Sequence, residues 1–202
     1  MKAAEHPFRF STAAYLTRIC NQRAARLSEL LAGLESCSDA SIFYHTLQSL
    51  GRHRFLIRGF ANAFAQRVES ACNRPVLAER LAGLDLRDYL SLGELRSDLI
   101  RVVGDYCRVH PAEADQFAFE PFFFCESIEV SAPLGVEAGT LEEFRQVLEG
   151  LTNASFHYHF ITSRLRLQLR TNDFSLWFQS ALGLEPLAPA RGLNRRLHAH
   201  PE

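Results

Sequence analysis

The chain has 202 residues, of which 47% are hydrophobic and 22% charged, a balance typical of a folded globular protein and not of a disordered one. Its net charge of -1 argues against non-specific nucleic-acid binding, which needs a strongly basic surface. The sequence holds no apolar run near the roughly 18 residues that cross a bilayer, and its first residues lack a signal-peptide pattern, so we expect neither membrane insertion nor secretion.

The cysteines indicate a compartment. There are five, an odd number, and no two of them form a Cys-x-x-Cys pair. This pattern fits free thiols that pack as small apolar side chains in a reducing environment. We therefore expect a cytoplasmic protein without a cysteine zinc site.

Several short blocks recur at a constant separation. Three pairs lie 114 residues apart: FRFS (8–11) with FFFC (122–125), LSEL (27–30) with LEEF (141–144), and SIFYH (41–45) with SFHYH (155–159). Two more lie 110 apart: NAF (62–64) with NDF (172–174), and LA (77–78) with LA (187–188). The constant offset predicts an internal duplication, and the slip of four places an insertion near residues 51–59.

Each half is predicted to follow one order. It begins with a short aromatic strand, FRF (8–10) or FFFCESIEV (122–130), and the second strand ends at Pro133-Leu134-Gly135. A helix follows (23–34 or 140–151), then a segment with a histidine, then a helix that begins at Asn62 or Asn172. An amphipathic helix over 91–111 connects the halves. Capping boxes are predicted at Thr140 with Glu143 and at Ser91 with Glu94.

These elements predict a mainly α protein (α+β at most) made of two similar helical halves. A short two-stranded ribbon would form if the FRF and FFF segments paired antiparallel. We expect a first helical repeat over 1–85, a connecting helix over 86–118, and a second repeat with a basic C-terminal tail over 119–202, all in one compact unit.

The segment FHYHF (156–160) admits two conformations. Its alternation is typical of a strand, on which His157 and His159 would share a face and suit a divalent metal. The matching segment SIFYHTLQSL (41–50) lacks alternation and follows a Ser38-Asp39 cap, which favours a helix for both copies. In that alignment His159 matches His45, whereas His157 matches Phe43.

Three roles for His45 and His159 remain open. They are buried histidines hydrogen-bonded to the main chain, ligands of a metal together with Asp173, or general acid–base groups working with Tyr44, Tyr158 or Asp173. No nucleophile signature, phosphate-binding glycine loop or dinucleotide fingerprint accompanies them, so we expect no cofactor.

The second half resembles a bacterial and archaeal domain family of unknown function. The residues that carry the resemblance are a Ser-x-x-x-His block present twice (41–45 and 155–159) and Asn-Asp-Phe-x-x-Trp at 172–177. The resemblance extends over most of the chain and implies an architecture but no activity. The chain departs from the family pattern at Ala63 and Arg67, where an acid and an indole are expected, and at Thr162, where Glu is expected.

The loss of these acids favours a protein that is not an enzyme. Our first hypothesis is a non-enzymatic helical accessory or protein-interaction subunit, within a larger assembly or self-associating. The alternative is a metal- or small-molecule-binding enzyme with a site between the two halves.

Overall fold

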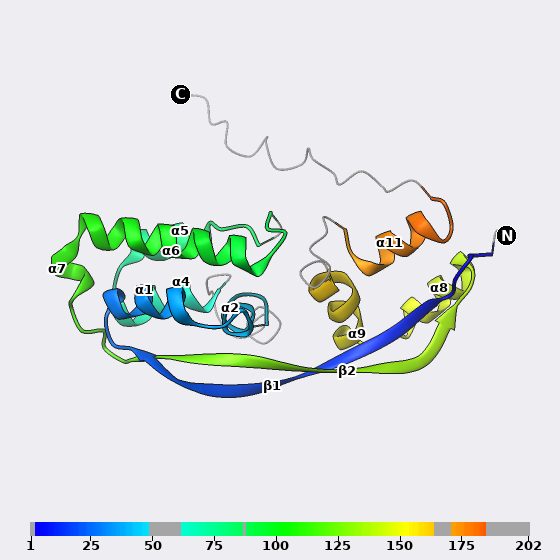
Figure 1. Cartoon of the computed structure of the whole chain (residues 1–202), viewed down its shortest axis with the longest axis horizontal. Helices are drawn as coiled ribbons and strands as arrows, with labels where there is room; N and C mark the ends of the chain where they lie inside the picture. The colour runs from blue at the N-terminus through cyan, green and yellow to red at the C-terminus, as the bar shows by residue number, and fades with distance from the viewer. Residues whose placement is uncertain (1–2, 49–61, 87, 164–170, 185–202) are drawn as a thin grey trace, which may run out of the picture. The chain divides into compact units, whose positions relative to one another are not determined.

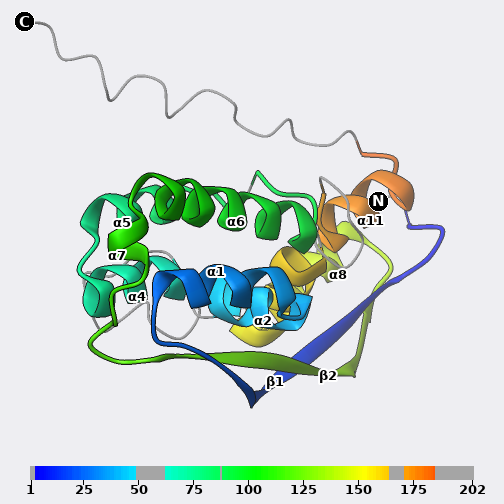
Figure 2. The same cartoon turned by 60° about the vertical axis from the view of Figure 1, so that its left-hand side comes forward.

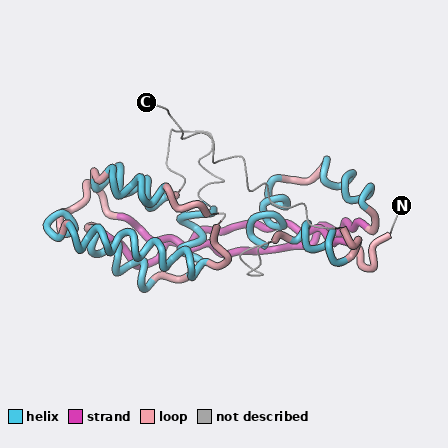
Figure 3. The backbone as a smooth tube through the Cα atoms, turned by 90° about the horizontal axis from the view of Figure 1, so that it is seen from above, coloured by secondary structure: helices cyan, strands magenta, loops and turns pink. Residues whose placement is uncertain are grey.

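Two long strands form the frame of the fold. The computed structural model describes residues 3–48, 62–86, 88–163 and 171–184. Strands β1 (Phe8–Ala24) and β2 (Phe122–Ala138) have 17 residues each and lie side by side as a two-stranded sheet (Figures 1 and 3). Ion pairs fix their direction, since Arg9 contacts Glu137 at 2.9 Å and Arg18 Nε lies 2.9 Å from Glu126 Oε2. The strands are therefore antiparallel.

The predicted fold class is wrong. A mainly α protein does not contain two paired strands of this length, and the fold is α+β. The ion-pair register also places FRF beside the end of β2 and not beside FFF. The internal duplication is not shown by the structure, in which the helices after β1 outnumber those described after β2.

The end predicted for β2 is also wrong. The strand continues through Pro133 and Gly135 to Ala138, and Gly135 has a φ of 70°. Proline lacks an N–H and is tolerated on an edge strand, while a glycine with positive φ is typical of a bulge. Turn residues in the sequence are thus compatible with a strand that has only one neighbour.

The chain forms two compact units. Unit 2 comprises residues 13–132 and 165–170, and unit 1 comprises 1–12, 133–164 and 171–202. Each strand therefore begins in one unit and ends in the other. The helices that follow β1 pack on the start of β2, and those that follow β2 pack on the start of β1.

Unit 2 has the larger core. Helices α1 and α2 lie between the strands and α6 (Figures 1 and 2). Its fully buried side chains include Phe64, Leu99 and Phe124. Its elements after β1 are α1 (Leu27–Ser36), α2 (Asp39–Phe43), the π-helical segment η1 (Tyr44–Gln48), α4 (Ala63–Cys72), α5 (Pro75–Ala82), α6 (Leu92–Val109) and α7 (Pro111–Ala114).

Unit 1 has an aromatic core. Phe8 and Phe10 of β1 pack against Phe144, Phe174 and Trp177. The rings of Phe144 and Trp177 are stacked with centroids 5.2 Å apart. The helical elements are α8 (Leu141–Glu149), α9 (Asn153–His157), the π-helical segment η2 (Tyr158–Thr162) and α11 (Asp173–Ser180).

The helix starts predicted at Ser91, Thr140 and Asn172 are confirmed, whereas the helix predicted over 23–34 begins later, at Leu27, because β1 continues to Ala24. Thr140 and Glu143 form the capping box of α8, and Ser91 accepts from the Glu94 amide at the start of α6. Asn172 caps α11 by accepting from the Ser175 amide. Local side-chain chemistry is sufficient to place these helix ends. No helix in the described ranges is long and apolar enough to cross a membrane.

A close helix–strand contact gives the first testable prediction. A Cβ at Gly33 of α1 would lie 2.2 Å from the ring of Phe124, which is fully buried. Gly33→Ala should therefore destabilise the protein by about 1–3 kcal/mol through overpacking. The measurement is the free energy of unfolding from denaturant titration.

Gly104→Ala on α6 is the matched control, because its Cβ would meet Leu31 at an ordinary 3.8 Å. Alanine favours the helix there by up to about 1 kcal/mol. Equal effects of the two substitutions would contradict the packing account.

Candidate functional site

His159 holds the main chain of β1. It is 3% exposed, and its Nε2 accepts the backbone N–H of Ser11 at 2.8 Å. Its Nδ1 lies 2.9 Å from Asp173 Oδ2. Because Nε2 is the acceptor, the ring proton is on Nδ1 and is donated to the carboxylate.

Ser155 completes this contact. Its hydroxyl donates to the carbonyl oxygen of Ser11, the residue whose amide His159 accepts. Positions four residues apart lie on the same helix face, so the Ser-x-x-x-His spacing presents both side chains to one strand residue. The motif thus binds both main-chain polar groups of Ser11.

His45 makes the corresponding contact in unit 2. It is 4% exposed, and its Nε2 accepts the backbone N–H of Cys125 of β2 at 2.9 Å. Both histidines are enclosed by aromatic rings, which for His45 include Phe122 at 4.7 Å and Phe64 at 5.3 Å. Burial lowers the pKa of His45 to about 4, so the ring is neutral near pH 7.

The two contacts differ in detail. In unit 1 Ser155 donates to the strand, whereas no hydrogen bond to a strand is described for the buried hydroxyl of Ser41. Ala63 stands at the first position of α4, where α11 has Asp173. Both units therefore contain the hydrogen bond from a strand amide to a histidine, but the polar side chains around the histidine differ between the units.

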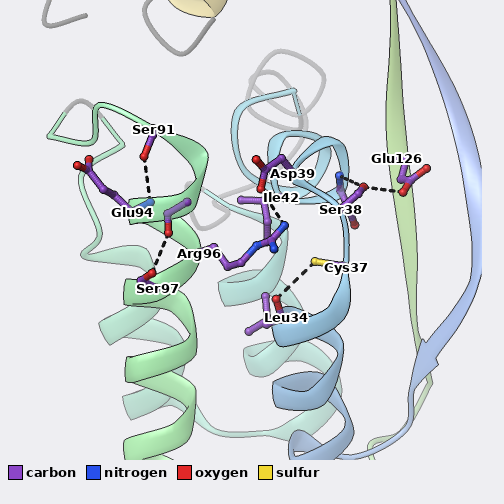
Figure 4. A network of polar contacts seen from close by, with 12 residues as sticks. Leu34, Cys37, Ser38, Asp39, Ile42, Ser91, Glu94, Arg96, Ser97 and Glu126 are labelled. Carbon is purple, nitrogen blue, oxygen red and sulfur yellow. Dashed lines mark hydrogen bonds and ion pairs between the residues drawn. The ribbon is translucent and has the colours of Figure 1, made fainter. Parts of the chain in front are cut away.

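A network of polar contacts positions the helix that leads to His45 (Figure 4). Ser38 caps α2 by accepting the Ser41 amide, and its hydroxyl donates to Glu126 of β2 at 2.5 Å. Hydrogen bonds from Ser38 and then Arg18 lower the pKa of the Glu126 carboxyl. Asp39 and Arg96 of α6 form an ion pair at 2.8 Å. Helix α2 is thus fixed to both the strand and α6.

This geometry decides what the histidines can do. A metal ligand or general base uses an imidazole lone pair, and Nε2 of each ring already accepts a main-chain N–H. In His159 the second nitrogen is bonded to Asp173. In the part of the chain that the structure describes, no group of three or more His, Cys, Asp or Glu residues is arranged to hold a metal.

The other candidate residues lie around these rings. Tyr44 packs edge-on to His45 at 4.9 Å and Tyr158 to His159 at 5.0 Å. The segment FHYHF is helical, as the sequence favoured. It covers the end of α9 and the first three residues of η2. His157 faces Thr162 at 3.4 Å, and burial lowers its pKa. The predicted insertion at 51–59, the run 164–170 and the tail from 185 lie outside the described residues.

The main-chain partners were missed at the sequence level. Nothing in the side chains of Ser11 and Cys125 marks their amides as hydrogen-bond donors to histidine. Ser155 and His159 share one helix face, but the sequence does not identify the strand residue that this face contacts.

Comparisons with known proteins give a family without an assigned activity. A family model described as a family of unknown function (DUF5752) matches residues 5–195. The solved structure of OrfY from Thermoproteus tenax is similar, with a TM-score of 0.81 and 27% identity over 91% of this chain and 82% of that one. No curated protein matches.

The two serines allow a matched test of the motif. Ser155→Ala removes a hydroxyl that donates to the strand and leaves the Ser11 carbonyl without that donor. It should cost about 1–2 kcal/mol of unfolding free energy, whereas Ser41→Ala should cost much less because Ser41 has no such bond among the described residues. Denaturant unfolding of both variants measures the difference, and equal losses would contradict the assigned role.

The depressed pKa of His45 predicts a pH dependence. Its folded pKa of about 4 lies below the ordinary 6.5, so the unfolded state binds more protons between these values. The stability that His45 contributes is present above pH 6.5 and lost as the pH falls through about 4, and it amounts to at most about 3 kcal/mol.

His45→Gln retains an acceptor for the Cys125 amide but does not titrate. It should flatten the fall in unfolding free energy between about pH 7 and 4.5. His110→Gln, at a more exposed histidine, controls for loss of a histidine as such. A pH profile of His45→Gln that superimposes on wild type would exclude His45 as the titrating group.

Proposed function

Because the chain belongs to DUF5752, a family of unknown function, we propose from its own contacts that it is a non-enzymatic protein-interaction subunit. The observation that carries this proposal is the use of both central histidines as acceptors for strand amides. Side chains committed to holding the main chain support a scaffold role. The alternative of a metal or acid–base enzyme gains no support from them.

The strands offer a surface for a partner. Residues 128–137 of β2 are exposed at every position, and Ile128 and Val130 are 41% and 53% exposed. These two alternate with Glu129, so they share one face of the strand. A two-stranded ribbon is marginally stable alone in water, and exposed apolar strand residues are typical of interaction sites.

We propose a second copy of the chain as the partner at residues 128–132. This stretch lies between Cys125, held by His45, and Pro133, which cannot donate to a ladder. Two antiparallel copies of one strand edge are self-complementary about a twofold axis. Pairing there would cover Ile128 and Val130 and satisfy main-chain groups at the outer edge of β2.

Sedimentation velocity tests this proposal on the full chain. The wild type should be dimeric at micromolar concentrations, and Val130→Lys should weaken dimerisation about tenfold or more because it puts a charge into the contact. Val76→Lys on α5 is the control, since Val76 is equally exposed but lies on another element. A monomeric wild type, or equal weakening by both substitutions, would contradict the proposal.

A further inference from the structure

Unit 2 contains a pocket at the start of β2. It is shallow and open to solvent, with a volume of about 420 Å³. The described residues that line it are Arg67, Glu120, Pro121, Phe122 and Phe123. The lining places the charged Arg67 next to the rings of Phe122 and Phe123. A charge beside apolar surface is costly unless a hydrogen-bonding partner satisfies it.

Arg67 is incompletely paired in this position. Its side chain is 18% exposed, and Nη1 contacts Glu120 Oε2 at 3.1 Å. Nε and Nη2 are buried and have no acceptor among the described residues. Glu120 is 76% exposed, and an ion pair with so exposed a carboxylate contributes little. The guanidinium therefore retains hydrogen-bonding capacity that the described residues do not satisfy.

Trp177 in unit 1 provides a comparison. It stands five residues after the capping Asn172, as Arg67 stands five after the capping Asn62. Its indole Nε1 donates to the His6 carbonyl at 2.8 Å, and its ring packs 5.7 Å from Phe8. The indole fills the space at the start of β1.

At the start of β2 the corresponding space is lined by an arginine. Glu120 precedes Phe122 by two residues, as His6 precedes Phe8. Arg67 contacts Glu120 there, but a guanidinium on a flexible stem lacks the apolar volume of an indole. The pocket therefore adjoins an arginine that has the same position relative to its helix cap as Trp177 has in unit 1.

We propose that this pocket binds a small carboxylate with an aromatic body. The carboxylate would replace Glu120 on the guanidinium, which binds such groups through two parallel N–H donors. The aromatic part would occupy the volume beside Phe122 and the half-exposed ring of Phe123. This site does not depend on the proposed interaction function, and it uses neither histidine as a ligand.

The site adjoins the His45 contact. Phe122 lines the pocket and also lies 4.7 Å from the His45 ring, whose Nε2 accepts the Cys125 amide. A ligand that packs on Phe122 would bury one more face of this aromatic cluster. Binding should therefore raise the unfolding temperature as well as give a saturable signal.

The probe is phenylacetate, and phenylacetamide is its neutral isostere. Titration of the full chain by calorimetry or amide-resolved NMR should show phenylacetate binding about tenfold or more tightly than phenylacetamide, because only the acid forms the charged contact. Acetate, which lacks the ring, should bind more weakly than phenylacetate. The preference for the acid should disappear in Arg67→Gln and in Arg67→Trp, the latter filling the pocket.

Two further variants complete the test. Glu120→Gln removes the competing carboxylate at an exposed position, so it should fold normally and bind phenylacetate several-fold more tightly. Arg108→Gln, at an exposed arginine paired with Asp105, should leave binding unchanged. The proposal is overturned if phenylacetate does not bind at millimolar concentration, binds no better than phenylacetamide or acetate, or is weakened equally by Arg67→Gln and Arg108→Gln.

Discussion

The structure depends on one hydrogen bond made twice, from a strand amide to the lone pair of a buried histidine. An N–H enclosed by aromatic rings must be paired, and a neutral imidazole meets this need only when Nε2 is unprotonated. The burial that makes the bond valuable also keeps His45 neutral, through its low pKa. His159 makes an additional hydrogen bond, in which its Nδ1 donates to the Asp173 carboxylate. This bond selects the tautomer that leaves Nε2 as the acceptor.

These bonds tie together segments that are far apart in sequence. His45 is 80 residues from Cys125, and His159 is 148 from Ser11. The helices after each strand thus hold the beginning of the other strand, and neither core is complete until both strands are in place. Such a non-local arrangement favours cooperative and comparatively slow folding. It also occupies main-chain groups of Ser11 and Cys125 that would otherwise lie open at a strand edge.

The sequence predicted what is determined locally and missed what is determined at a distance. Helix starts at Ser91, Thr140 and Asn172 follow from side chains that cap nearby amides, and all three are confirmed. Most of β1 lacks a clear alternation of buried and exposed side chains. Helices cover one face of the strand over part of its length, and other stretches are exposed on both faces. Pro133 and Gly135 suggested a turn, yet an edge strand accommodates both residues. The bonds to the strand amides carry no side-chain signature on the strand.

The two units differ at two positions beside these histidines. Ala63 begins α4 where α11 has Asp173, yet His45 still contacts Cys125, because accepting an amide requires a lone pair and not a carboxylate. Arg67 stands five residues after the capping Asn62, as Trp177 stands five after Asn172, and it places a charge instead of apolar volume next to Phe122. Two nitrogen donors of Arg67 have no acceptor among the described residues. The buried His45 is satisfied by the strand amide, but the Arg67 guanidinium finds only part of its hydrogen bonding among the described residues, through Glu120.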